Sequence, residues 1–275
     1  MAPTTAPTRR RRRQPLIALS YFSAHTLLKA GVSEPVARSV AAQLAFRGYD
    51  TQQVIWARGA EVQSWQFIIS GLVAATTPTQ EERSVPITIY GADSWFGEKP
   101  ILNRMSARFE YVCLSETQVL VMPVAVFQKL FDTEPGFSRY LAKLTTWRAQ
   151  RSAEMLTLMK LGNPPLRVVM GIAQFAEALA SRSERPPTVG LDGGIAIPAS
   201  QAVIAQLCGV SRAVFSEYVQ PLALDGWLAI RYGSIELLSI ATWQRFSSAR
   251  RALPTDHINP TMAELLAELH RASGM

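Results

Sequence analysis

The chain has 275 residues, of which 48% are hydrophobic and 18% are charged. This length and composition allow a sizeable buried core and exclude a chain that is disordered throughout. The formal net charge is +7, and a single run, Arg9–Arg13, supplies five of those seven positive charges. We therefore expect the folded part to carry any nucleic-acid surface locally rather than through its bulk charge.

The two cysteines, Cys113 and Cys208, lie far apart and outside any CxxC pattern. They exclude a disulfide framework and a four-cysteine iron-sulfur cluster, and they favour a reducing compartment. No stretch is apolar over the length that a membrane helix needs, and no apolar segment with a cleavage site follows the arginines. We expect a cytoplasmic protein that makes no membrane contact.

Residues 1–22 are predicted to form a disordered basic tail, because prolines, threonines and the arginine run bury little apolar area. Two roles stay open for Arg9–Arg13. The run either adds salt-dependent, sequence-independent affinity for a polyanion or is solvated without function.

Residues 23–133 are predicted to form a β-roll with flanking helices. Helical periodicity up to Phe46 is followed by short β-branched and aromatic segments separated by glycine-containing turns, which is typical of a β-barrel or sandwich. The expected strands are Val54–Trp56, Gln66–Ile69, Val73–Ala75, Val85–Tyr90, Phe109–Leu114 and Gln118–Met122.

Residues 134–162 are predicted to form a long helix that ends at Gly162-Asn163-Pro164-Pro165. Alternating three- and four-residue steps mark one stripe on this helix, which resembles a coiled-coil seam. Either the stripe is a dimer interface or it packs on the chain's own barrel. Its members are Leu141, Leu144, Arg148, Arg151, Met155 and Leu158.

Residues 163–247 are predicted to form a winged helix-turn-helix. Ser200 precedes a short helix, Cys208-Gly209-Val210 forms a tight turn, and Ser211 precedes a second helix over 212–224. Two strands, Trp227–Arg231 and Ile235–Leu238, then form the wing. The alternative is an ordinary helical hairpin. Residues 248–275 are expected to add a C-terminal helical extension.

The second helix of this motif is the expected recognition helix, with Val214, Tyr218, Val219 and Leu222 facing inward. Ser211, Arg212, Phe215 and Ser216 are expected to point outward or obliquely. Arg212 is the best base reader because a guanidinium binds guanine O6 and N7 bidentately. Glu217 is either an acceptor for a cytosine amine or a solvated side chain, and Ser200 and Arg231 are expected near phosphates. The candidate DNA-binding residues are therefore Ser200, Ser211, Arg212, Ser216, Glu217 and Arg231.

An enzyme is not predicted. The three histidines, His25, His257 and His270, lie near the two ends of the chain and lack ligand spacing, and no nucleotide-loop, nucleophile-elbow or zinc-protease motif occurs. No histidine lies in the β-rich segment or in the central helix, so we expect neither a catalytic metal nor haem.

The order of these parts resembles the Crp/Fnr family of bacterial transcription regulators over residues 45–240. The likeness rests on Gly59, on Trp65-Gln66-Phe67-Ile68-Ile69-Ser70-Gly71, on Phe96-Gly97-Glu98 and on Gly209-Val210-Ser211-Arg212. The resemblance implies an α+β chain with a jelly-roll sensory domain, a central helix that dimerises, and a DNA-binding wing. It implies a homodimer that binds double-stranded DNA at a palindromic operator, with RNA polymerase as a candidate partner.

The resemblance also implies a nucleotide site that begins at Gly97 and Glu98, with Glu98 toward a ribose hydroxyl. Members that bind cyclic AMP carry an Arg-Ser or Arg-Thr pair on the next strand, where this chain has Ala107-Arg108. Arg104 or Arg108 is then either the substitute phosphate partner or a solvated loop residue. This departure argues against cyclic AMP and leaves another nucleotide, such as a cyclic dinucleotide, or ligand-free activity.

Two further departures concern the operator and the metal. Members that read the best-known palindrome carry a glutamate directly after the arginine and a second arginine four residues beyond it, where this chain has Ala213 and Glu217. We therefore expect a changed operator. The cysteine cluster of the iron-sulfur branch is absent. The alternative function is a nucleotide-binding signalling module that acts through protein contacts without DNA.

Overall fold

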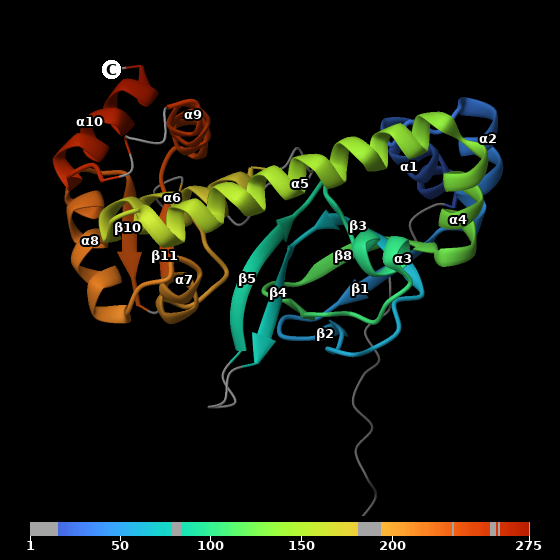
Figure 1. Cartoon of the computed structure of the whole chain (residues 1–275), viewed down its shortest axis with the longest axis horizontal. Coiled ribbons are helices and arrows are strands. Elements are labelled where there is room, and N and C mark those ends of the chain that lie inside the picture. The colour runs from blue at the N-terminus through green and yellow to red at the C-terminus, as the bar shows by residue number, and fades with distance from the viewer. Residues whose placement is uncertain are drawn as a thin grey trace, which may run out of the picture.

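One helix of 27 residues, α5 (Pro135–Leu161), runs along the length of the molecule and joins a β-rich part to a helical part (Figure 1). The computed structural model describes residues 16–78, 84–180, 194–232, 234–253, 257 and 259–274. Arg9–Arg13 and most of the loop rich in proline and glycine before the helix-turn-helix lie outside these residues. None of the helices described is long and apolar enough to cross a lipid bilayer.

The first helix, α1 (Leu16–Lys29), begins earlier than expected. Residues 16–22 are therefore helical, which corrects the predicted extent of the disordered tail. The segment continues as α2 (Glu34–Val40), with proline tolerated in its first turn, and as a 3-10 turn over Ala41–Gln43. At Gly31 the backbone is left-handed, and an added Cβ would lie 2.4 Å from the carbonyl oxygen of Gly136. This close approach fixes the N-terminal helices to the start of α5.

Two four-stranded antiparallel sheets form the β-roll, in the orders β1-β8-β3-β6 and β2-β7-β4-β5. The six predicted strands are present, and β1 and β6 are additional. Two helices follow strands of the roll, α3 (Glu98–Asn103) and α4 (Val124–Thr133). The strands are β1 (Ala45–Tyr49), β2 (Val54–Trp56), β3 (Ser64–Ser70), β4 (Leu72–Pro78), β5 (Ser84–Gly91), β6 (Trp95–Phe96), β7 (Glu110–Cys113) and β8 (Thr117–Pro123).

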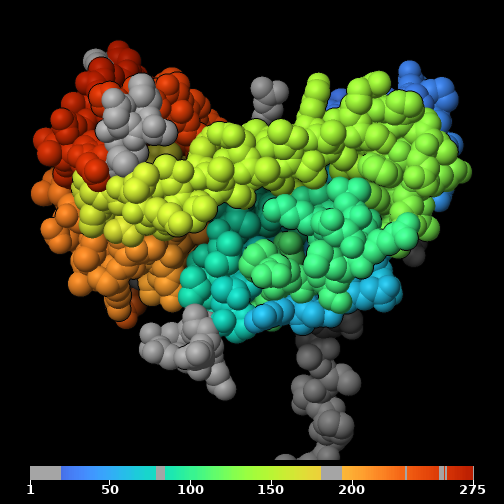
Figure 2. Space-filling model, viewed as in Figure 1, coloured from blue at the N-terminus to red at the C-terminus, as the bar shows by residue number. Residues whose placement is uncertain are grey.

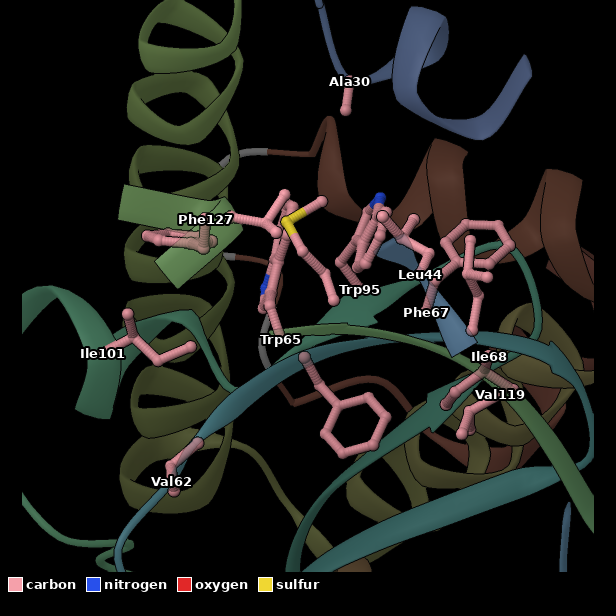
Figure 3. Close-up of a cluster of buried hydrophobic side chains, with 14 of the residues drawn as sticks. Ala30, Leu44, Val62, Trp65, Phe67, Ile68, Trp95, Ile101, Val119 and Phe127 are labelled. Atoms are coloured by element: carbon pink, nitrogen blue, oxygen red, sulfur yellow. The ribbon is translucent and has the colours of Figure 1, made fainter. Parts of the chain in front are cut away.

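Aromatic side chains fill the end of the β-roll that faces α5 (Figure 3). The indole rings of Trp65 and Trp95 stack with their centroids 4.0 Å apart. Phe127 of α4 and Phe137 of α5 approach Trp65 edge-on, at 5.3 and 5.6 Å. Because α5 contributes directly to this core, its first half is held by the β-roll of its own chain.

The C-terminal part begins at Asn163, whose side chain accepts a hydrogen bond from the backbone N–H of Leu166 and caps the next helix. The wing is part of a three-stranded sheet in the order β10-β11-β9, so the predicted two-stranded hairpin has a third partner. The elements are α6 (Pro164–Leu179), β9 (Ile195–Ala196), α7 (Gln201–Leu207), α8 (Arg212–Leu224), β10 (Leu228–Arg231), β11 (Ser234–Leu237), α9 (Ile240–Arg251) and α10 (Met262–Ser273).

The C-terminal part packs directly on the β-roll of the same chain. Leu72 and Ala74 of β4 belong to the same buried cluster as the core of the helix-turn-helix. At Gly91 an added Cβ would lie 1.7 Å from the carbonyl oxygen of Ala178 in α6. Only glycine permits this approach, so Gly91 marks the point where the two parts meet most closely.

Candidate DNA-binding surface and effector site

The helix-turn-helix has the predicted boundaries and caps. The hydroxyl of Ser200 accepts from the backbone N–H of Val203, and the hydroxyl of Ser211 accepts from that of Val214, both at 3.3 Å. These bonds begin α7 and α8 at the expected residues. The two candidate DNA-binding serines therefore cap helices and lie at the surface of the motif.

The turn between the two helices is held from behind by α5 and α6. Gly209 has a φ of +64°, and an added Cβ would lie 2.6 Å from Sδ of Met159 on α5. Arg167 of α6 donates from Nη1 to the Gly209 carbonyl oxygen at 3.2 Å. Burial raises the pKa of the neighbouring Cys208 thiol, which therefore packs as a neutral side chain. Residues of α5 and α6 thus set the angle at which α8 leaves the turn.

The recognition helix buries Phe215, Val219 and Leu222. Phe215 is fully buried, so its predicted outward position is wrong, and Val214 and Tyr218 are only partly buried. Val219 and Leu222 are buried as predicted, and the buried face is shifted from Val214 and Tyr218 toward Phe215. Periodicity alone did not distinguish these positions, because the steps 214–218–222 and 215–219–222 both fit helical spacing. The exposed residues of the helix are Arg212, Ala213, Ser216, Glu217, Gln220 and, at its end, Leu224.

The wing places Arg231 at the end of β10, opposite Ser234 of β11. Nε of Arg231 lies 3.2 Å from Oε2 of Glu236, and the arginine side chain stays partly exposed. The cation proposed for a phosphate contact therefore already has a carboxylate neighbour. Glu236 was not identified from the sequence as part of this surface.

In the β-roll, Glu98 is almost completely buried and forms an ion pair with Arg148 of α5. Arg148 is also buried, and its Nη2 donates to the carbonyl oxygen of Trp95. Gly97, with a φ of +95°, lets the chain turn into α3 against the ring of Trp56. The predicted glutamate is thus placed in the interior, and its partner comes from the central helix.

Aromatic rings surround this ion pair. The ring centroid of Phe96 lies 5.2 Å from that of Trp56, 5.7 Å from that of Tyr90 and 5.6 Å from that of Tyr111. The guanidinium carbon of Arg148 lies 5.3 Å from the Tyr90 ring centroid. Burial raises the pKa of both tyrosines, which therefore stay neutral near physiological pH. Side chains of the protein itself occupy the space around Glu98.

Arg104 and Arg108, the two predicted phosphate partners, are exposed. Arg104 ends α3 in a left-handed conformation. A cavity of about 260 Å³ lies between β5, α5 and α6, and neither of these arginines lines it. The cationic side chains on this cavity are Lys99, Arg148 and Arg151.

The predicted seam on α5 packs against its own chain, which favours the second of the two expected arrangements. Leu141 is buried in the β-roll core and Leu144 packs against it, whereas Leu158 packs against the C-terminal core. Met155 accepts from Nε2 of Gln174. The apolar stripe predicted from the sequence is present on α5, and the β-roll and α6 of the same chain pack against it.

The two arginines of that stripe have carboxylate partners within the chain. Arg148 pairs with Glu98, and Arg151 donates to Glu177 of α6 at 2.7 Å. Arg251 at the end of α9 binds both oxygens of Glu177, at 2.5 and 3.0 Å. Glu177 therefore connects α5, α6 and α9, and it fixes the C-terminal part against the central helix. An arginine within an apolar stripe signals a buried acidic partner, but its spacing does not say which one.

Comparison with known proteins agrees with this arrangement. Residues 46–134 match the family model of the cyclic nucleotide-binding domain. The chain is 23% identical over 213 residues to the CRP-like cAMP-activated global transcriptional regulator of Mycobacterium tuberculosis, covering 76% of this chain and 92% of that protein. It is 21% identical over 175 residues to the cAMP-activated global transcriptional regulator CRP of Haemophilus influenzae, covering 63% and 75%.

Solved structures share the fold. FixK2 from Bradyrhizobium japonicum matches with a TM-score of 0.60 at 15% identity, over 79% of this chain and 98% of that chain. The c-di-GMP responsive global regulator CLP of Xanthomonas campestris matches with a TM-score of 0.56 at 17% identity, over 75% and 100%. Together, the domain match and these curated relatives support the Crp/Fnr family for this chain. The resemblance seen in the sequence and the predicted α+β class are confirmed, and the curated relatives are transcriptional regulators rather than enzymes.

Proposed function

We propose that this Crp/Fnr protein is a homodimeric regulator that acts in the cytoplasm and binds a palindromic operator in double-stranded DNA. The observation that carries the proposal is the exposed polar face of α8, which follows a capped turn and is flanked by a wing. Such a face suits the major groove, where Arg212 would read guanine and Ser216 and Glu217 would lie beside it. Ser200, Ser211 and Arg231 would contact phosphates.

The homodimer is supported by the outer face of α5. Five exposed residues follow one another in four- and three-residue steps, which is the repeat of a two-helix seam. Figure 2 shows one side of α5 uncovered along the molecule. Three of the five are alanines, so two copies of the helix could approach closely. The residues are Ala142, Thr146, Ala149, Ala153 and Leu156. A two-fold axis through this seam would match the symmetry of a palindrome.

We propose further that DNA binding needs no cyclic AMP. The Glu98 carboxylate is almost completely buried and pairs with the Arg148 guanidinium, so a ribose hydroxyl would reach it only if the surrounding side chains moved. Breaking a buried ion pair leaves an uncompensated charge, which costs about 3–5 kcal/mol. Arg148 would thus take the place that a ligand holds in an effector-dependent member, and it would link α3 to α5 permanently.

The test combines selection and titration. Wild-type protein without added nucleotide is used to select binders from randomised duplexes, and the selected duplex is then titrated with and without cyclic AMP. We expect a palindromic motif and the same affinity in both titrations. Arg212→Ala should relax the motif, and Lys129→Ala, on an exposed position of α4, is the matched control. Failure of wild type to select any motif would favour the alternative module that acts through protein contacts. A requirement for cyclic AMP would refute the effector-free part.

A further inference from the structure

The C-terminal helix α10 lies beyond the wing and packs against α6, α8 and α9. It begins with a capping box between Thr261 and Glu264, and it buries Leu265 and Leu269 completely in the C-terminal core. The helix is therefore an integral part of the folded C-terminal domain. Nothing in the proposed DNA-reading surface yet gives it a role.

Two arginines fix α10 along α9. Arg250 pairs with Glu268 at 2.7 Å, and Nε of Arg245 donates to the carbonyl oxygen of Ala272 at 2.5 Å. The second contact satisfies a carbonyl in the last turn of α10, where the helix has no partner of its own. The C-terminal end of α10 is thus held in a defined position.

That end reaches the turn between the recognition helix and the wing. Asp225 ends α8, Gly226 continues with a φ of +79°, and Trp227 precedes β10. Oδ2 of Asp225 accepts from the indole N–H of Trp227 at 2.6 Å and lies 2.9 Å from Nε2 of His270. The ring centroids of His270 and Trp227 are 4.9 Å apart, at an angle of 70°. One carboxylate oxygen therefore joins α8, the wing and α10.

We propose that His270 is a positioning residue for DNA recognition, which acts on the angle between α8 and the wing through Asp225 and Trp227. This inference rests on the proposed DNA binding. The recognition helix and the wing must contact the duplex together, so a change in their angle weakens the contacts that depend on register. The His270–Asp225 pair is partly exposed and contributes little to stability by itself. Its contribution is geometric.

The test measures the affinity ratio between the duplex selected with wild type and a scrambled duplex of the same composition. We expect His270→Ala to lower this ratio about tenfold, the size of one mismatched base pair, because contacts that depend on register weaken. His270→Gln should restore most of the ratio, because its amide N–H can donate to Asp225. Arg271→Ala is the matched control on the same helix, and its loss of charge should weaken both duplexes alike.

A second readout does not involve DNA. The indole N–H resonance of Trp227, assigned with Trp227→Phe, should shift in His270→Ala and return toward its wild-type position in His270→Gln. Equal losses on both duplexes together with a lower melting temperature would reduce His270 to a structural role and overturn the inference. If wild type discriminates between the two duplexes and His270→Ala discriminates equally well, the inference about His270 is wrong while the proposed function stands. No discrimination by wild type would overturn the proposed function as well.

Discussion

Arg148 of α5 lies against Glu98 of α3 inside the β-roll, and 50 residues of chain separate the two charges. The same guanidinium contacts the carbonyl oxygen of Trp95 and lies over the ring of Tyr90. The central helix is therefore joined to the interior of the β-roll by a charged pair rather than by apolar packing alone. A charge pair in this position costs desolvation energy, so its two members are expected to depend on each other strongly.

The first prediction removes one member of this pair. Arg148→Met should lower the free energy of unfolding by about 3–5 kcal/mol, because it leaves the Glu98 carboxylate buried without a cation. Glu98→Gln combined with Arg148→Met should recover most of that loss. Urea unfolding of the single and double variants measures both. A loss below about 1 kcal/mol for the single variant would mean that the pair is solvated rather than buried.

The second prediction concerns the contact between the β-roll and α6. In Gly91→Ala the new methyl group would meet the Ala178 carbonyl, so the two parts must move apart. Overpacking of this kind costs about 1–3 kcal/mol. We expect a lower melting temperature and faster proteolysis between the two parts. Gly48→Ala in β1 is the matched control, because no atom lies within 4 Å of its added Cβ. Equal stability of the two variants would argue against the docked arrangement.

The third prediction separates the two faces of α5. Ala149→Glu and Ala153→Glu together should give monomers by analytical ultracentrifugation while the melting temperature changes little, because both positions are exposed in one subunit. Leu141→Glu should instead unfold the β-roll, because this side chain is buried within its own chain. A double variant that remains dimeric would show that the outer face is not the interface.

The two faces of α5 illustrate which features could be predicted from the sequence and which could not. The strands of the β-roll were predictable because β-branched and aromatic runs alternate with glycine-containing turns. β1 was missed because its segment, Ala45–Tyr49, holds no β-branched residue and includes a glycine, and β6 because it has only two residues. The stripe on α5 was predictable as an apolar face, but periodicity cannot say which surface covers it.

Some residues of the candidate sites could likewise be placed from the sequence, and others could not. Caps and turns are local, so Ser200, Gly209 and Ser211 were placed correctly from the sequence. The partners of Glu98 and Asp225 depend on the tertiary fold, whereas Arg231 meets Glu236 within one hairpin. Arg148 and His270 reach their partners from 50 and 45 residues away, and no local pattern encodes such pairs.

The fourth prediction concerns the capping box of α10. The backbone and hydroxyl of Thr261 donate to the Glu264 carboxylate and hold its pKa below the ordinary value. A carboxyl whose pKa is lower in the folded state stabilises the fold above its unfolded pKa, and that contribution is lost as the pH falls through the folded pKa. In an NMR titration, the Thr261 amide resonance should therefore shift at a pH below the usual pKa of a glutamate. Glu264→Gln should abolish this movement. A titration at the ordinary glutamate value would contradict the capping box.

The last prediction concerns the wing. Glu236 lies beside Arg231 and partly neutralises the cation proposed to contact phosphate. Glu236→Gln should remove one negative charge beside Arg231, so affinity for selected and scrambled duplexes should rise alike and the dependence on salt should steepen by about one counterion. Arg231→Ala should lower the affinity for both duplexes alike and make the dependence on salt shallower.

Arg212→Ala should instead relax the selected motif at one base pair in each half-site, with a loss of about 1–3 kcal/mol of discrimination. Titrations at several salt concentrations, together with selection on randomised duplexes, separate these outcomes. If Arg212→Ala changed only the salt dependence, α8 would touch phosphates and the base reading would lie elsewhere.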